Sequence, residues 1–406
     1  MCAQKLDLDT KMQFDIFFSI CQTPVDGYKP TEREMLKNFF SQALLADSLG
    51  FRTAWVAETH LSCQVQKRNP GAVIPHFEGE IGLNTDILQV AHILFAKTKR
   101  LNVGSAIMNI QCNGGPMAHA EAIRTFLSLH SLDESEKRIL DIGFAAGRFP
   151  FSNTPYGIRP RTAVEEAAWP VVKGKIFREA TEIFLRFLRG DVLSSREVSA
   201  RWLERKDFRS DEDWQKVIQA HGKPVDRIAV PNLWNFDQVG VIPFEAPLDC
   251  LRLTIGCHDL ATQIFANEFY PCGVFNLSIT PTDQIEATHA ALQKHFHKSG
   301  GPWTRGHMPR TVLVFLDHDA KRAQEKARHA LTNYWKAMEG TLDPKKVENA
   351  VGNALVGDVA KIKEEMRKRF HREDRLMLWF DFNNHGNEEV RGSMKMFMEQ
   401  VAPDFA

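Results

Sequence analysis

The chain has 406 residues, of which 43% are hydrophobic and 25% are charged. This composition is typical of a globular protein with a large core, and the length suits one enlarged α/β domain. Lysine plus arginine and aspartate plus glutamate number 51 each, so the formal net charge is zero. This balance argues against a nucleic-acid-binding protein, which normally has a basic excess. No run of eighteen apolar residues suggests a helix that spans a membrane.

The seven cysteines, an odd number, include no pair with CxxC spacing. The polar segment Met1–Lys11 lacks the apolar core of a signal peptide. We therefore expect reduced thiols in a cytoplasmic protein. His60 and Cys63 have the spacing of metal ligands, but no second pair completes a zinc site, so we expect no bound metal.

Short apolar runs alternate with amphipathic helices along the chain. The first helix opens at a capping box, Thr31 to Glu34, and Gly50 is well placed to end it. Eight runs are predicted to be strands: Met12–Ile20, Phe51–Ala57, Leu101–Ile107, Arg138–Phe144, Leu251–Ile255, Val274–Ile279, Thr311–Leu316 and Arg375–Phe380. Further helices are predicted at Asn84–Lys97, Pro116–Leu129, Lys175–Leu188, from the Thr280 N-cap with Pro281 at its first position, at Ala320–Met338 and at about Glu388–Gln400.

Eight strand–helix units favour a (β/α)₈ TIM barrel. No G-x-G-x-x-G follows a strand, which argues against a dinucleotide-binding sheet. We expect one domain over residues 1–406, interrupted by insertions at about 149–170, 190–247 and 341–356. Insertions that follow barrel strands usually lie over the C-terminal, catalytic mouth.

Reactive side chains are expected where the strands end. These ends hold Glu58-Thr59-His60, Asn109 with Asn113 and Gly114-Gly115, Ala145-Ala146-Gly147-Arg148, Gly256-Cys257-His258, and Asp381 with Asn383. Glu58 and His60 suit either a structural or a catalytic role. The small residues that end the fourth strand either permit tight packing or leave room for a flat ring. Arg148 adds a positive charge, and a helix start after Gly256 offers N–H groups to a phosphate. Together these features indicate a phosphorylated planar cofactor.

Several segments share both pattern and order with a known family. They are MQFDIFF, ADSLGF, AWVAETH, NVGSAIM, GGPMAHAEAIRTFLSL, RILDIGFAAGR, ALVGDVAKI and FMEQVAPDF. In this order the chain resembles the bacterial luciferase-like, flavin-dependent monooxygenases over nearly its whole length outside the insertions.

The resemblance implies that reduced FMN, or in one branch a deazaflavin, binds at the C-terminal mouth. The flavin ring would lie near a bulge of the third strand that often includes a non-proline cis peptide, here near Ala106-Ile107, with Ala145 and Gly256 beside it. The phosphate would be held by the ends of strands four and five, which are Gly147, Arg148, Cys257 and His258 in this chain.

The chain also departs from the family pattern. Thr59 replaces the first histidine of the usual pair, and Ala145 stands where luciferases have a cysteine. The usual arginine position is Ala146, with Arg148 two residues on. We therefore expect no light emission from a long-chain aldehyde. His60 is expected to perform acid–base chemistry, with Thr59 assisting by hydrogen bonding. Both can face the site only if the strand ends before them, because side chains alternate along a strand.

The leading hypothesis is a monooxygenase that uses reduced FMN and dioxygen to oxidise a small organic substrate. The chain shows no nicotinamide-binding domain, so a separate flavin reductase would supply the reduced FMN. A homodimer is expected to form through the helices near Asn84–Lys97 and Pro116–Leu129. Two alternatives stay open: a deazaflavin-dependent hydride-transfer oxidoreductase, and a catalytically silent flavin-binding partner subunit.

Overall fold

The structure, a computed structural model, describes residues 11–62, 79–147, 150–337 and 344–406. Its main sheet has nine strands in the order β10-β9-β11-β1-β2-β3-β4-β7-β8, and every neighbouring pair is parallel. The strands are β1 Gln13–Phe18, β2 Thr53–Val56, β3 Asn102–Asn109, β4 Leu140–Ala145, β7 Leu251–Ile255, β8 Cys272–Val274, β9 Arg310–Leu316, β10 Leu355–Gly357 and β11 Arg375–Trp379.

The sheet curls around its own interior, as contacts between non-neighbouring strands demonstrate. Arg375 of β11 donates to Asp141 of β4 at 3.0 Å, although three strands separate β11 from β4. The rings of Trp55 on β2 and Phe275, just after β8, lie 5.6 Å apart. A single parallel bridge, Asn276 to Arg310, links the end of β8 to β9. The protein is therefore an α/β fold built on a curled parallel sheet.

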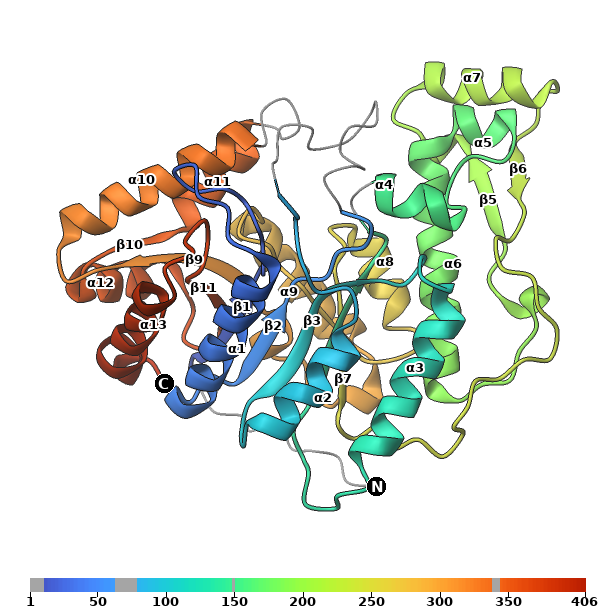
Figure 1. Ribbon diagram of the computed structural model, residues 1–406. Coiled ribbons are helices and arrows are strands. Elements are labelled where there is room, and N and C mark those ends of the chain that lie inside the picture. Colours follow the sequence, from blue (N-terminus) through green and yellow to red (C-terminus); the bar gives the residue numbers. More distant parts are fainter. Residues whose placement is uncertain (1–10, 63–78, 148–149, 338–343) are drawn as a thin grey trace.

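The helices around this sheet are α1 Glu32–Leu49, α2 Ile87–Lys97, α3 Gly115–His130, α4 Pro150–Asn153, α5 Ala163–Ala167, α6 Trp169–Arg189, α7 Asp211–His221, α8 Leu260–Ala266, α9 Thr282–His295, α10 Ala320–Ala337, α11 Pro344–Asn353, α12 Val359–Arg369 and α13 Asn387–Met396, which continues as a π-helical turn, Phe397–Val401. They lie on the outside of the sheet, except for α5 and α7, which stand beside it next to α6 (Figure 1). In the described part of the chain, no helix has both the length and the apolar character needed to cross a membrane.

Local sequence signals explain where the first helix begins and ends. Thr31 accepts a hydrogen bond from the backbone N–H of Glu34 at 3.2 Å, as the capping box predicts. Gly50 adopts φ 87°, the left-handed conformation that ends many helices, and a side chain there would be strained. On α6, all seven residues of the predicted apolar stripe are buried: Ile176, Phe177, Ala180, Ile183, Phe184, Phe187 and Leu188.

Two predicted boundaries were wrong. The sixth strand was predicted at Val274–Ile279, but β8 ends at Val274. Thr280 does not cap the following helix, because its hydroxyl accepts from the N–H of Leu277 at 3.0 Å and closes a turn. α9 instead has Pro281 at its N-cap and begins at Thr282. The three-residue strand β10 was not predicted, because so short a run has no detectable alternation.

The segment from 190 to 247 has a small hydrophobic core of its own. It contains α7 and the antiparallel hairpin of β5, Arg201–Glu204, and β6, Arg227–Val230. Leu203, Trp214 and Ile228 from this segment pack against Val172 and the N-terminal half of α6. Figure 1 shows the hairpin and α7 standing beside the main sheet, on the side of α6. The sequence analysis did not predict either element.

Candidate functional site

An apolar floor lies inside the curl, toward the C-terminal ends of the strands. Phe17, Trp55, Phe275 and Met377 form one buried cluster, although they come from four different parts of the sheet. Five less buried side chains pack on this cluster: Ala57, Ala106, Ile107, Leu277 and Trp379. Because they remain partly accessible, they form a surface on which an apolar ligand can rest.

Strand β3 is irregular where it borders this floor. The Ala106-Ile107 peptide is cis, at the position that the family resemblance implied. The register with β4 shifts between Ser105 and Met108. A Cβ atom on Gly256 would lie 2.4 Å from Cδ1 of Ile107 and 3.4 Å from Cβ of Ala145. The structure therefore brings Ala106, Ile107, Ala145 and Gly256 together into one wall of small and aliphatic groups.

The turn after β4 is held by buried amides. Gly147 has φ 72°, and a Cβ there would lie 2.1 Å from the Asn109 side-chain nitrogen, so only glycine fits. Asn109 donates to Asn153 at 2.7 Å, and Asn153 donates to the carbonyl of Ala146 at 3.3 Å. Arg148, the predicted phosphate ligand, lies outside the described residues. Asn153 was not singled out from the sequence, because nothing local marks an asparagine in a short helix as a partner of β3.

The expectation of unsatisfied N–H groups after Gly256 was wrong for Thr262. Asp259, the N-cap of α8, accepts from the Thr262 backbone at 3.1 Å and from its hydroxyl at 2.5 Å. Arg178 of α6 reaches the same carboxylate at 3.1 Å. Its charge also acts on Cys257, whose pKa is raised, chiefly by burial. Arg178 is a cation near the predicted phosphate ligands that the sequence analysis missed.

The segment after β2 forms a buried acid–base pair. Oε1 of Glu58 lies 3.1 Å from Nε2 of His60, and only 2% and 8% of these side chains are exposed. Ser105 of β3 donates to the other Glu58 oxygen at 3.4 Å, which links the pair to the residue before the cis peptide. β2 ends at Val56, so the alternation of strand side chains no longer applies here.

Thr59 forms hydrogen bonds with other residues than the Glu58–His60 pair. Its hydroxyl donates to the carbonyl of Gly82 at 3.1 Å and contacts the Ser62 hydroxyl at 3.3 Å. Its backbone N–H donates to the carbonyl of Asn84 at 3.1 Å. Thr59 therefore anchors the chain that carries His60 and does not share the Glu58 contact.

A second histidine, His119 of α3, lies within electrostatic range of the pair. Burial lowers its pKa, the Glu58 carboxylate opposes this shift, and a charge on His60 would add to it. One ring nitrogen of His119 contacts the carbonyl of Cys112 at 3.0 Å. The sequence analysis did not select His119, because a single histidine inside an amphipathic helix has no distinguishing pattern.

The end of β11 supplies a buried carboxyl group. Burial raises the pKa of Asp381 to about 7, and the Trp379 side chain only partly offsets this effect. One Asp381 oxygen has no hydrogen-bond partner among the described residues. Near neutral pH this acid is therefore part protonated, in contrast to an ordinary surface aspartate.

A sequence profile of the luciferase-like monooxygenases matches residues 12–225. Comparison with curated proteins finds no match. Among solved structures, monooxygenase RslO1 from Streptomyces bottropensis has a TM-score of 0.68 at 18% identity, covering 97% of this chain and 100% of that one. The FMN-bound oxygenating constituent of 3,6-diketocamphane monooxygenase from Pseudomonas putida has a TM-score of 0.58 at 13% identity, covering 98% and 99%.

An F420-dependent secondary alcohol dehydrogenase has a TM-score of 0.57 at 14% identity and covers 98% of this chain and 99% of its own. Identities this low establish only the shared fold. The profile is more specific, because it covers more than half of the chain, including β1 to β4 and the Glu58–His60 segment. The protein belongs to the luciferase-like monooxygenase family.

Proposed function

We propose that this protein is a flavin-dependent monooxygenase that oxidises a small organic substrate with dioxygen, using reduced FMN supplied by a separate flavin reductase. The observation that carries the proposal is the wall of Ile107, Ala145 and Gly256, which adjoins the buried Glu58–His60 pair. An apolar surface beside an acid–base pair suits a planar redox cofactor on the surface, with a substrate between the cofactor and the Glu58–His60 pair.

The residues at this wall fit a flavin ring. Ala106, Ile107, Ala145 and Gly256 are each partly accessible, and none has a side chain larger than isoleucine. Reduced FMN, when bound, supplies the electrons for the reaction with dioxygen. The chain's own contribution is to hold the ring against this wall and to exclude water from the apolar floor beneath it.

The phosphate end of the cofactor is proposed to lie near Gly147, Cys257 and His258, with Arg148 and Arg178 as its cations. Arg178 supports this placement because its side chain is 40% exposed and therefore reachable. Asp259 opposes it, since a carboxylate beside the N-terminus of α8 repels a phosphate. The two arginines are needed to outweigh that carboxylate.

His60 is proposed as the acid–base residue. When Glu58 is ionised, Nε2 of His60 donates to it, which leaves Nδ1 as the atom that takes or releases a proton. Thr59 assists by fixing the segment through its bond to the Gly82 carbonyl. A positioned imidazole of this kind typically contributes about 10²–10⁴-fold to a rate.

We further propose that the sheet closes into a (β/α)₈ barrel forming a single domain with the three insertions named above. The Asn276–Arg310 bridge supports closure, because it joins the two sides of the gap. Trp234 supports an insertion over the mouth: a Cβ on Gly115, which begins α3, would lie 2.6 Å from its indole nitrogen. Cys112, Cys250, Cys257 and Cys272 are thiols, which supports a reducing, cytoplasmic location.

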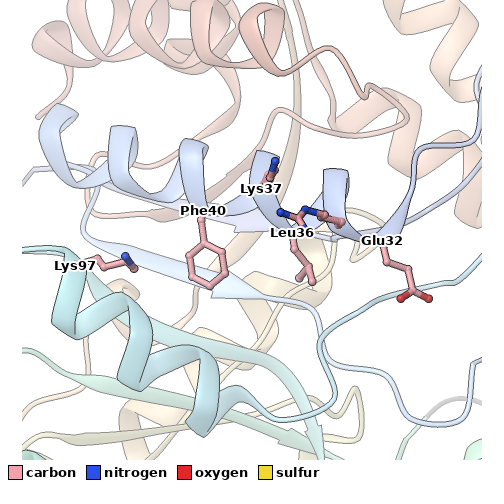
Figure 2. Close-up of a pocket in the computed structure, with 6 residues that line it drawn as sticks. Glu32, Leu36, Lys37, Phe40 and Lys97 are labelled. Carbon is pink, nitrogen blue, oxygen red and sulfur yellow. The ribbon is translucent and has the colours of Figure 1, made fainter.

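A homodimer through α2 and its neighbouring helices is also proposed. Leu36 and Phe40 project from α1 toward α2 and line a shallow hollow with Lys97 (Figure 2). A second hollow lies between α2 and α3 and includes Leu129, whose side chain is exposed. Exposed apolar groups on both sides of one helix are typical of a protein–protein contact.

Hydride transfer with a deazaflavin is the second candidate, and the likeness to the F420-dependent dehydrogenase favours it. A silent flavin-binding partner subunit is the third, because Thr59 replaces the family's first histidine. Anaerobic titration with reduced FMN and with reduced F420 should give tighter binding of FMN. Oxygen consumption with a flavin reductase and a panel of small ketones, alkanes and aromatic compounds should then exceed the substrate-free rate.

Two results would contradict the leading proposal. Turnover of F420 without any need for dioxygen would establish the hydride-transfer alternative. Tight flavin binding with no turnover, alone or with a paralogue, would favour a silent subunit. As a matched test of cofactor orientation, Arg148→Ala should weaken FMN about ten-fold or more and leave riboflavin, which has no phosphate, nearly unchanged.

A further inference from the structure

A cavity of about 380 Å³ opens at the N-terminal ends of the strands, at the opposite end of the sheet from Glu58 and His60. Arg52 directly precedes β2, Arg252 is the second residue of β7, and Arg375 is the first residue of β11. All three side chains line this cavity. Its other wall is formed by Tyr270 and Pro271 before β8, by Gly273 within β8, and by the segment that precedes β9.

These three arginines form a cluster of like charges, in which Arg375 is buried and Arg52 and Arg252 are partly buried. Burial, together with the charges of Arg375 and Arg252, lowers the pKa of Arg52 to about 10. The same three cations, with burial as the largest cause, lower the pKa of His307 in the cavity wall to about 4. His307 is therefore neutral at physiological pH. The cluster requires negative charge nearby to be stable.

Among the described residues, two buried carboxylates, Asp15 and Asp141, face three guanidinium groups, and burial raises the pKa of Asp15. Arg375 takes both of them, donating to Asp15 at 2.6 Å and to Asp141 at 3.0 Å. Asp249 also lines the cavity, but its side chain is exposed, so solvent screens its charge. One positive charge is left in excess in the buried part of the cavity.

Arg252 differs from the other two arginines in having no hydrogen-bond partner among the described residues, although the carboxylates of Asp141 and Asp15 act on its charge at longer range. Arg375 bonds to both aspartates, and Arg52 donates to Gln13. Arg252 makes no hydrogen bond or ion pair with any residue in the described ranges, and one of its terminal nitrogens is fully buried. An unpaired buried guanidinium is costly. A purely structural network accounts for Arg375 but leaves Arg252 unexplained.

We propose that this cavity binds a small organic monoanion, a carboxylate whose oxygens accept hydrogen bonds from Arg252. A single excess positive charge matches a monoanion better than a phosphate dianion. The walls favour an organic molecule, because Tyr270, Phe296 and Pro302 line the cavity beside the arginines. The volume lies within the range of small-molecule sites and suits a one-ring acid.

Calorimetric titration of the full chain with benzoate tests the proposal, with the neutral isostere benzamide as the matched ligand. Benzoate should bind with one-to-one stoichiometry, equally well with and without saturating FMN, and benzamide should bind at least ten-fold more weakly. Arg252→Gln should weaken benzoate ten-fold or more, the usual size of one charge-assisted contact. The same substitution at the exposed Arg196 should have no effect.

Any of four results would contradict the proposed carboxylate site: benzoate does not bind, benzamide binds equally well, FMN displaces benzoate, or an equal concentration of inorganic phosphate displaces benzoate. Full benzoate affinity in Arg252→Gln would place any binding elsewhere. If that variant does not fold, Arg252→Met, which keeps the aliphatic stem without an amide, takes its place and should show the same loss.

Discussion

The two ends of the curled sheet treat ionisable groups in opposite ways. At the N-terminal end, Arg375 lies between Asp15 and Asp141, and Thr53 and Trp55 each donate to one oxygen of these carboxylates. At the C-terminal end, no cation among the described residues acts on the pKa of Asp381, and the Glu58 carboxylate contacts His60 and Ser105. Fixed charges stabilise the first end, whereas protons can move at the second.

Burial alone would raise the pKa of Asp141, yet Arg375, Arg252 and Arg52 hold it below its usual range. The same burial without arginines raises the pKa of Asp381 to about 7. Between Asp141 and Asp381 the difference lies in the neighbours, whereas at Asp15 burial outweighs Arg375 and Arg52 and the pKa is raised. An aspartate therefore serves structure at one end of a strand and is available for chemistry at the other.

Removing His60 should have the largest effect on function. His60→Ala is expected to lower turnover about 10²–10⁴-fold with little change in flavin affinity, because only proton transfer is lost. Steady-state rates and flavin titrations measure the two quantities. Thr59→Ala is the control and should retain most of the turnover. The reverse pattern, with Thr59→Ala inactive, would show that the wrong neighbour was chosen.

Removing Arg375 should have the largest effect on stability. Arg375→Met leaves two buried carboxylates without their shared cation and should cost about 3–5 kcal/mol, measured from the urea midpoint by circular dichroism. Adding Asp15→Asn and Asp141→Asn should recover part of the loss. Arg196→Met at an exposed pair should change stability by less than about 0.5 kcal/mol. Equal losses of unfolding free energy in Arg375→Met and Arg196→Met would contradict the stabilising role of the charges at the N-terminal end of the sheet.

Asp381 should make stability fall as the pH rises. Its folded-state pKa of about 7 lies above the ordinary value of 3.8, so the folded protein binds the proton more tightly. The favourable contribution is complete below about pH 4 and is lost as the pH rises through 7. Asp381→Asn cannot ionise and should be more stable than the parent at pH 8, by roughly 2–4 kcal/mol. Urea unfolding of both proteins from pH 4 to 8 tests this. The same dependence of the unfolding free energy on pH in Asp381→Asn as in the parent would contradict it.

Substitutions at two glycines, Gly143 and Gly256, distinguish the packing role of the wall of small residues from its role in FMN binding. A Cβ on Gly143 would lie 2.4 Å from the Ser105 carbonyl oxygen, which cannot move without distorting β3. Gly143→Ala should therefore cost about 1–3 kcal/mol. A Cβ on Gly256 meets only the flexible end of Ile107, so Gly256→Ala should be milder in thermal unfolding but should still weaken FMN. Equal stability losses would mean that the wall is only a packing feature.

The smallest expected effect is at Arg178. It is partly exposed and already paired with Asp259, so Arg178→Gln should weaken FMN only about two- to five-fold. Riboflavin affinity should not change, since it lacks the phosphate. Weakening of both ligands would indicate that Arg178 acts through Asp259 and the start of α8.

Local patterns in the sequence determined the elements that position the site. The alternation of apolar runs and amphipathic helices predicted eight of the nine parallel strands, although the bounds of β8 were wrong. The ends of the predicted strands also pointed to Glu58, His60, Ala145 and Gly256. These features depend on neighbours in the chain, through alternation, capping and glycine conformation. The position of the cis peptide came from family resemblance and not from any local pattern.

Only the tertiary structure decided which charges meet. Arg375 contacts Asp15 and Asp141, which lie hundreds of positions earlier in the chain, because the sheet curls and brings β11 opposite β4. The same curl leaves Arg252 without a hydrogen-bond partner in the described part of the chain, and the packing of α3 brings His119 near Glu58. Electrostatic pairing depends on distances across the interior, and no local pattern of residues encodes those distances.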